Sequence, residues 1–186
     1  MALAAVIDAS PLIYYARLDR LAFVSLVVGE VGIAPAVYQE AVVEGLRRGH
    51  SDAARIEEAL RHGTLSVVSL DARERQLAGQ LQVDPRLGPG ECETIACAGR
   101  RGVHAILEDR KARQVAARHD VRTMKSVDIL FLGLLRGNIA LFEFRRDLRR
   151  LSQVTGIDTA TLFEYEALAE EIATLVNQAK GGKDSG

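Results

Sequence analysis

Acidic side chains follow two apolar runs that lie far apart in this sequence. Asp8 comes directly after residues 3–7, and Glu108 and Asp109 come directly after residues 103–107. Both runs are short and lack helical spacing, which is typical of buried parallel strands. The carboxyl ends of parallel strands meet at one edge of a sheet, and ligands bind there. We therefore expect these carboxylates to approach one another in the folded chain.

Two further acids stand near the starts of expected helices. Glu40 lies in a helix that Pro35 opens, and Glu91 begins a helix after the Pro- and Gly-containing loop 84–90. Each acid alone has an ordinary structural role as well, because carboxylates stabilise the positive end of a helix dipole. Several carboxylates in one pocket repel, which raises at least one pKa unless a cation is present. Oxygen ligands without His or Cys select Mg²⁺ or Mn²⁺ over zinc, so the set predicts a site for such an ion.

Short apolar runs alternate with helical segments along the rest of the chain. This alternation predicts βαβ units and a mostly parallel sheet, arranged as a three-layer α/β/α sandwich with additional helices at the C-terminus. Strands are expected at residues 3–7, 31–34, 64–70, 103–107 and 121–123. Helices are expected at residues 12–18, 36–46, 51–61, 72–81, 91–100, 110–119, 127–135, 142–151 and 159–178, with a further apolar stretch at 21–28.

The boundaries of the larger parts follow from length and from breaker residues. Ser10 and Pro11 are expected as the N-cap and the first residue of the first helix. The length fits one main domain at residues 1–156, followed by a helical extension at 157–179 and a flexible tail at 180–186.

The composition is that of an ordinary soluble protein. The 186 residues carry 24 Lys and Arg against 25 Asp and Glu, so the whole chain is not a polybasic nucleic-acid binder. The N-terminus has no basic segment before its apolar run, which argues against a signal peptide, and no apolar stretch is long enough to span a membrane. Cys92 and Cys97 are too few for a disulfide scaffold and lack zinc-site spacing. We expect a protein of the reducing cytoplasm.

Positive charge is concentrated in one part of the chain. Residues 100–150 contain 13 Lys and Arg against 6 Asp and Glu. The expected helix 142–151 contains two i,i+4 arginine pairs, Arg145 with Arg149 and Arg146 with Arg150. Such pairs repel on a helix, so a surface that tolerates them suggests an anionic partner. The acidic helix 159–178 has three alternatives: it packs on its own domain, crosses to a second subunit, or covers the basic helix and hides it from RNA.

Four segments, in this order, resemble the PIN-domain superfamily. They are VIDASPLIYYARL from Val6, IAPAVYQEAV from Ile33, LGPGECETIACAGRRG from Leu87 and AILEDRKARQVAARHDV from Ala105. The G-E-x-E-x-I-x-x-A pattern of the third segment and the D-R-x-A-R pattern of the fourth are most similar to a PIN-like branch that includes VapC-type toxins. The chain departs from the family's pattern at Glu108, where an Asp is frequent, at Lys125-Ser126, where a Gly-Thr pair is common, and at Asp128, which stands near an expected Gly.

The resemblance implies a metal-dependent endoribonuclease, often the toxin of a toxin–antitoxin pair. Carried over by position, its catalytic and metal-binding acids are Asp8, Glu40, Glu91 and Asp109. With Mg²⁺ or Mn²⁺ as the cofactor, we expect Asp8 and Asp109 to be direct ligands. Glu91 would be a second ligand or hold a metal-bound water, and Glu40 would bind a water or a second ion.

The expected substrate contacts lie beside these acids. Ser10 and Ser126 are expected to hydrogen-bond the scissile phosphate or a ligand carboxylate, whereas Arg110, Lys111 and Arg113 are expected to bind flanking phosphates. The implied partners are an RNA substrate, an antitoxin protein and a second copy in a homodimer, with no membrane. The alternative is a catalytically weak PIN-like module that binds RNA or a protein, and a nuclease acting on DNA or structured RNA is a further one.

Overall fold

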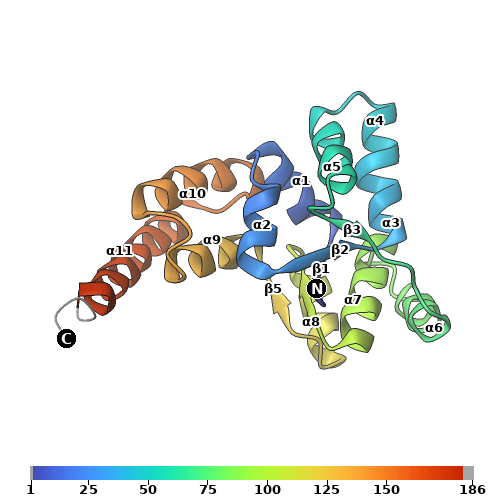
Figure 1. Ribbon diagram of the computed structural model, residues 1–186. Helices are drawn as coiled ribbons and strands as arrows, with labels where there is room; N and C mark the ends of the chain where they lie inside the picture. The colour runs from blue at the N-terminus through green and yellow to red at the C-terminus, as the bar shows by residue number, and fades with distance from the viewer. Residues whose placement is uncertain (1, 182–186) are drawn as a thin grey trace. The chain divides into compact units, whose positions relative to one another are not determined.

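A computed structural model describes residues 2–181. Its contacts divide the chain into two compact units, with the boundary after Ser126. The first unit contains a five-stranded sheet, and the described part of the second unit is helical (Figure 1). The predicted domain ends at residues 156 and 179 stay predictions. Of the predicted tail 180–186, residues 182–186 lie outside the described residues, and residues 180 and 181 belong to the last helix.

The five strands are all parallel, in the order β3-β2-β1-β4-β5. They are β1 (Leu3–Ile7), β2 (Glu30–Ile33), β3 (Ser66–Val67), β4 (His104–Ile106) and β5 (Thr123–Met124). The chain builds β1, β2 and β3 in one direction and then returns to place β4 on the other side of β1. The strand order therefore reverses between β1 and β4, which is where a parallel sheet opens a crevice for ligands. The predicted parallel α/β architecture is confirmed.

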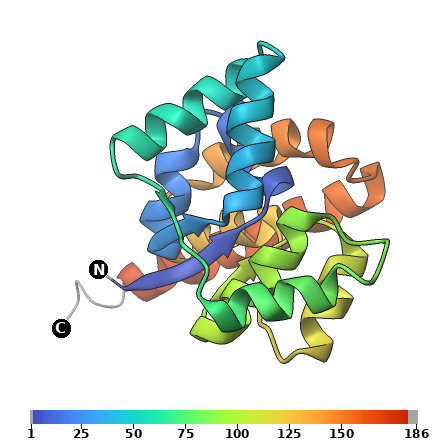
Figure 2. The same ribbon diagram turned by 90° about the vertical axis from the view of Figure 1, so that its right-hand side faces the viewer.

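Helices cover both faces of this sheet. Those of the first unit are α1 (Ala9–Arg17), α2 (Leu21–Val28), α3 (Pro35–Tyr38), the π-helical turn η1 (Gln39–Glu44), α4 (Gly45–Arg47), α5 (Ser51–Arg61), α6 (Ala72–Leu81), α7 (Pro89–Arg101) and α8 (Arg110–Arg118). α6, α7 and α8 bury apolar residues against Val6, Ala105 and Leu107 of one face. α1, α2 and α5 lie on the opposite side of the sheet (Figure 2).

Two expected details of the first unit are wrong, and a third differs in its helical geometry. Asp8, not Ser10, is the N-cap of α1: its backbone is extended, at φ −79° and ψ 166°, and the helix begins at the next residue. The strand expected at 64–70 contains only Ser66 and Val67, because only these two positions pair with β2. The helix expected at 36–46 contains η1, a π-helical turn that is wider than a turn of α-helix. Such turns are rare in proteins, but many of those known lie at functional sites.

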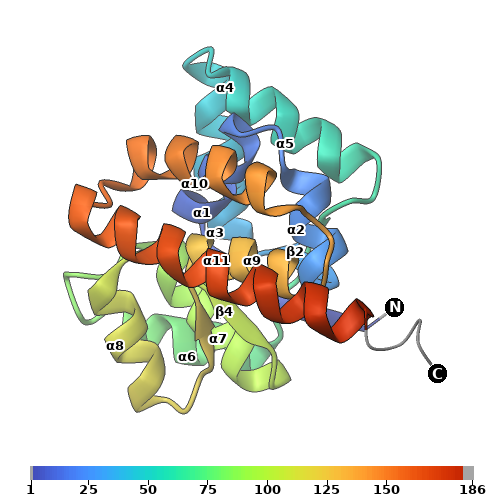
Figure 3. The ribbon, with the colours of Figure 1, turned by 90° about the vertical axis from the view of Figure 1, so that its left-hand side faces the viewer.

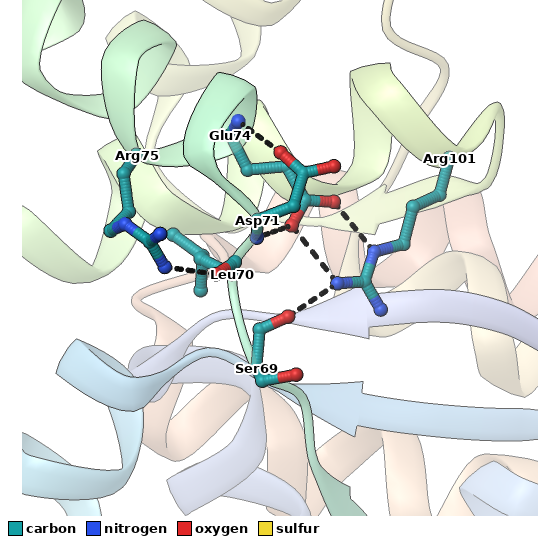
Figure 4. Close-up of polar contacts among 6 residues, drawn as sticks. All are labelled: Ser69, Leu70, Asp71, Glu74, Arg75 and Arg101. Atoms are coloured by element: carbon teal, nitrogen blue, oxygen red, sulfur yellow. Dashed lines mark hydrogen bonds and ion pairs between the residues drawn. The ribbon is translucent and has the colours of Figure 1, made fainter.

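A polar network fixes α7 against α6 (Figure 4). The Arg101 guanidinium at the end of α7 donates to both carboxylate oxygens of Glu74, at 2.6 and 3.0 Å, and to the Ser69 carbonyl at 2.7 Å. Glu74 is buried, and its carboxylate also accepts from the backbone N–H of Asp71 at 2.8 Å, forming a capping box at the start of α6. The far end of the helix that carries Glu91 is thereby anchored.

The second unit contains α9 (Ser126–Leu135), which starts at the unit boundary, α10 (Leu141–Thr155) and α11 (Thr159–Gly181). α10 and α11 pack side by side (Figure 3). Arg149 pairs with Glu166 at 2.8 Å, and Arg145 pairs with Glu170. The acidic helix α11 thus packs on the basic helix α10 of the same chain, but it does not hide that helix, because Arg146, Arg149 and Arg150 remain exposed. The i,i+4 repulsion between Arg145 and Arg149 is offset by glutamates of the same chain.

Candidate metal and substrate site

Asp8 is the innermost of the predicted site acids. It directly follows β1, its backbone N–H donates to the Ile106 carbonyl of β4 at 3.0 Å, and only 6% of its surface is exposed. Asp8 therefore lies at the point between β1 and β4 where the strand order reverses. This is the position that parallel-strand geometry predicts for a ligand-binding residue.

Gly90 shows how closely Asp8 and Glu40 approach. A Cβ atom at Gly90 would lie 3.2 Å from Oδ1 of Asp8, 3.2 Å from Cγ2 of Val37 and 3.6 Å from Oε2 of Glu40. Oδ1 of Asp8 and Oε2 of Glu40 therefore both lie within 4 Å of one point, the Cβ position of Gly90. Since a Cβ atom here would press on Asp8 and Val37, glycine allows the start of α7 to approach the two acids closely.

The surroundings of Asp8 disfavour its charge. Burial, together with repulsion from Glu91 and Glu40, raises the pKa of Asp8 from 3.8 to about 7. The backbone N–H groups of Ala9 and Ser10, at the start of α1, act in the opposite direction. The metal-free site thus contains a buried carboxyl group that titrates near neutral pH.

Glu91 interacts electrostatically with Asp8 and with the other two predicted acids. It lies half-buried in the first turn of α7, where Oε2 accepts from the Gly88 backbone N–H at 2.8 Å. Burial raises the pKa of Glu91, the Gly88 hydrogen bond lowers it, and the charges of Asp109 and Glu40 raise it. Each predicted acid therefore interacts electrostatically with at least one other.

Asp109 is held by the helix that it caps. Its Oδ1 accepts from the backbone N–H groups of Lys111 at 2.7 Å and Ala112 at 2.9 Å, at the start of α8. A carboxylate at this position is favoured by the helix dipole and by two unpaired N–H groups. Its second oxygen remains available to a ligand, since an ionised carboxylate accepts several hydrogen bonds or metal contacts.

The carboxylate oxygens of the site suit an ion that keeps several of its water ligands better than an ion bound by protein atoms alone. Within the described part of the chain, no three Asp, Glu, His or Cys side chains are grouped closely enough to hold an ion as they stand. Mg²⁺ keeps several waters and takes only one or two carboxylates directly, so a looser ring of oxygens is compatible with it. A divalent charge beside Asp8 would also favour its ionised form, which burial and, to a smaller extent, repulsion from Glu91 and Glu40 disfavour.

A cavity of about 500 Å³ opens beside these acids. It shares Glu40 and Gly90 with them, and η1 contributes much of its wall. Small and apolar side chains line it together with Glu44, Arg48 and His50. Its volume is within the range of small-molecule sites, so a group of nucleoside size fits next to the acidic site.

Two departures from the family's pattern contact each other. The carboxylate of Glu108 accepts from the hydroxyl of Ser126 at 2.6 Å and from its backbone N–H at 3.1 Å. The hydroxyl of Tyr15 donates to the Ser126 carbonyl at 2.7 Å. Ser126 is fully buried, so its hydroxyl holds the segment after β4 to the segment after β5 within the first unit. A glutamate at position 108 is long enough to make this bond.

The other residues predicted to contact the substrate differ in their exposure and in their hydrogen bonds. Arg110 and Lys111 are exposed at the start of α8. The Arg113 guanidinium donates to the backbone carbonyl of Glu108. Ser10 is exposed on α1. Arg110 and Lys111 are therefore the more accessible basic side chains next to Asp109.

One contact near the site was not anticipated. The carboxylate of Glu93, on α7, accepts from the backbone N–H of Ala36 at the start of α3, at 2.7 Å. In the sequence, Glu93 was only the second glutamate of a motif, and nothing local signals a bond between segments 57 positions apart.

Comparison with known families agrees with the geometry. Residues 4–160 match the family model of the PIN domain, so the chain belongs to the PIN domain family. PIN domains have a nuclease-type fold, and members of the family usually are nucleases that bind divalent metal ions. No curated protein matches the chain. None of the helices within residues 2–181 combines the length and apolar character that a membrane span requires.

Proposed function

We propose that this chain is a Mg²⁺- or Mn²⁺-dependent endoribonuclease. The observation that carries the proposal is the buried carboxyl group of Asp8 at the strand-order reversal, with Glu40 and Glu91 close enough to raise its pKa. A buried group with a strongly raised pKa in a crevice is characteristic of functional sites. Four acids without a neutralising side chain favour a divalent cation and a phosphate substrate over acid–base chemistry alone.

Each acid has a role that its surroundings suggest. Asp8 and Asp109 would bind the ion directly, from the ends of β1 and β4. Glu91 would hold a further ligand position or a water, and Glu40 would orient a water from the side of α3 and η1. When bound, the ion activates a water and stabilises the negative charge that develops on the phosphate.

The substrate would be held mainly through its backbone. Arg110 and Lys111 are exposed beside Asp109 and would bind phosphates that flank the scissile bond. Ser10 is exposed near Asp8 and would contact the scissile phosphate. Ser126 is buried and its hydroxyl is bonded to Glu108, which is not one of the four proposed ligands, so we assign Ser126 a structural role and neither of its two predicted contacts.

One observation favours a second candidate, a catalytically weak PIN domain that binds RNA or a protein. Oε2 of Glu91 and Oδ1 of Asp109 already accept backbone N–H groups, and the described residues contain no preformed group of metal ligands. If these hydrogen bonds hold the two carboxylates more strongly than an ion would, the site does not bind the metal. The protein then keeps its fold but does not cleave RNA. An antitoxin partner and a homodimer are proposed on the family resemblance alone.

The test is cleavage of end-labelled single-stranded RNA with Mg²⁺, Mn²⁺ or EDTA. Wild-type protein is expected to cut internally with either ion, and EDTA is expected to stop it. Asp8→Asn is expected to lower the rate at least a hundredfold. Asp120→Asn makes the same chemical change at an exposed carboxylate outside the site and serves as the control. RNA binding without metal-dependent cleavage would favour the second candidate.

A further inference from the structure

The start of α3 has no capping side chain of its own. Its N-cap residue is Ala34, which has no side-chain acceptor, and Pro35 follows as the first helical residue. The backbone N–H of Ala36 belongs to the first turn, so it has no acceptor within the helix. The acceptor comes from α7 instead: Oε2 of Glu93 lies 2.7 Å from the Ala36 nitrogen.

This hydrogen bond joins the two segments that carry Glu40 and Glu91. Glu93 lies two residues after Glu91 on α7, and Ala36 lies four residues before Glu40 on the helical run of α3 and η1. Glu40 lies about one helical turn beyond Ala36 on this run. Gly90 of α7 packs on the same run, because its Cβ position would lie 3.2 Å from Cγ2 of Val37 and 3.6 Å from Oε2 of Glu40.

We propose that Glu93 is a positioning residue for the metal site: its carboxylate caps α3 from α7 and thereby sets the distance between Glu40 and Glu91. A hydrogen bond from an N–H group to a carboxylate is stronger than one between neutral groups, and a negative charge suits the positive end of α3. Without it, the N-terminus of α3 loses this hydrogen bond to α7, and Glu40 moves relative to Glu91. This inference rests on the proposed function, because it assigns Glu93 to the same site.

Three substitutions separate positioning from direct metal binding. Glu93→Gln keeps an oxygen that accepts the Ala36 N–H but loses the charge, whereas Glu93→Ala loses both. Glu93→Asp keeps the charge on a side chain one methylene shorter. Glu57→Ala, on the exposed face of α5, is the matched control. Far-UV circular dichroism establishes that each variant is folded.

The first readout is the dissociation constant of Mn²⁺ alone, measured by calorimetry. Glu93→Ala is expected to weaken binding about tenfold, Glu93→Gln less than threefold, and Glu57→Ala not at all. If Glu93→Ala does not fold, the order of the other two decides: Glu93→Asp is expected to be weaker than Glu93→Gln, because the short side chain does not reach Ala36. The proposal would be overturned if Glu93→Ala bound Mn²⁺ as tightly as wild type, or if Glu93→Gln bound Mn²⁺ as weakly as Glu93→Ala. The second result would make Glu93 a metal ligand.

The second readout requires no metal. Hydrogen exchange at the Ala36 amide is expected to become at least tenfold faster in Glu93→Ala and to stay slow in Glu93→Gln, because this amide has no acceptor in its own helix. Unchanged exchange in Glu93→Ala would refute the cap, whether or not the protein binds metal. Fast exchange in Glu93→Ala together with no Mn²⁺ binding by wild type would instead refute the proposed function, and with it the metal-site role of the cap.

Discussion

Asp8→Asn is expected to stabilise the metal-free protein at neutral and alkaline pH. Asp8 is almost fully buried, and burial together with repulsion from Glu91 and Glu40 raises its pKa from 3.8 to about 7. The asparagine side chain has nearly the same size and keeps an oxygen for the N–H groups of Ala9 and Ser10. It carries no charge, so it avoids the cost of burying one.

The size and pH range of this effect follow from the shift in pKa. A rise of about three in the pKa of one group corresponds to about 4 kcal/mol. The folded-state pKa of Asp8 lies above its unfolded value of 3.8, so the folded state binds the proton more tightly. The destabilisation is therefore absent below pH 3.8, grows as the pH rises towards 7 and is complete above that. Asp8→Asn is expected to match wild type near pH 4 and to exceed it by up to about 4 kcal/mol at pH 8.

The assay is urea-induced unfolding in EDTA at pH 4, 6 and 8, with Asp120→Asn as the control at an exposed carboxylate. Adding Mn²⁺ at pH 8 is expected to stabilise wild type and to leave Asp8→Asn unchanged, because a ligand that binds only the folded state stabilises it by mass action. A variant that is less stable than wild type at pH 8 in EDTA, or a stability difference that does not change with pH, would refute the argument.

Three further substitutions test other contacts, each by urea unfolding. Gly90→Ala is expected to lower the free energy of unfolding by about 1–3 kcal/mol and to weaken Mn²⁺ binding, because its methyl group presses on Asp8 and Val37. The control Gly79→Ala, in α6 with open space around it, is expected to raise the free energy of unfolding by about 0.5–1 kcal/mol. Equal effects of the two substitutions would contradict this reasoning. Arg101→Ala is expected to cost about 3 kcal/mol at pH 7 by leaving Glu74 unpaired. Because the bond to Arg101 holds the pKa of Glu74 below 4.5, this loss is expected to shrink at pH 3.5, and a pH-independent loss would contradict it. Ser126→Ala is expected to cost about 1 kcal/mol and to leave the KM for RNA unchanged, whereas a raised KM would restore Ser126 as a phosphate contact.

The parallel sheet and the position of Asp8 and Asp109 after its strands were predictable from the sequence because they depend on short-range patterns. An apolar run that ends in Asp8 or in Glu108-Asp109 identifies both a buried strand and the edge at which its acid lies. The loop before Glu91 was recognisable from its prolines and glycines, although α7 begins at Pro89, two residues earlier than expected.

Contacts between distant segments were not predictable in this way. The bonds from Glu93 to Ala36 and from Glu108 to Ser126 depend on how helices and strand ends meet, and no local pattern encodes them. The turn η1 follows from packing as well, since its residues have no composition that distinguishes them from an α-helix. The arginine pairs in α10 were visible in the sequence, but their partners in α11 were only one of three alternatives.

The most direct test of the central claim is calorimetric titration of wild-type protein and Asp8→Asn with Mn²⁺ at pH 8. If the carboxylates at the ends of β1 and β4 form one metal site, wild type binds the ion at millimolar concentrations or below and Asp8→Asn binds at least about tenfold more weakly, a difference of about 1.4 kcal/mol. Equal binding by the two proteins would place the ion away from Asp8. No binding by wild type at millimolar Mn²⁺ would contradict the metal-dependent nuclease.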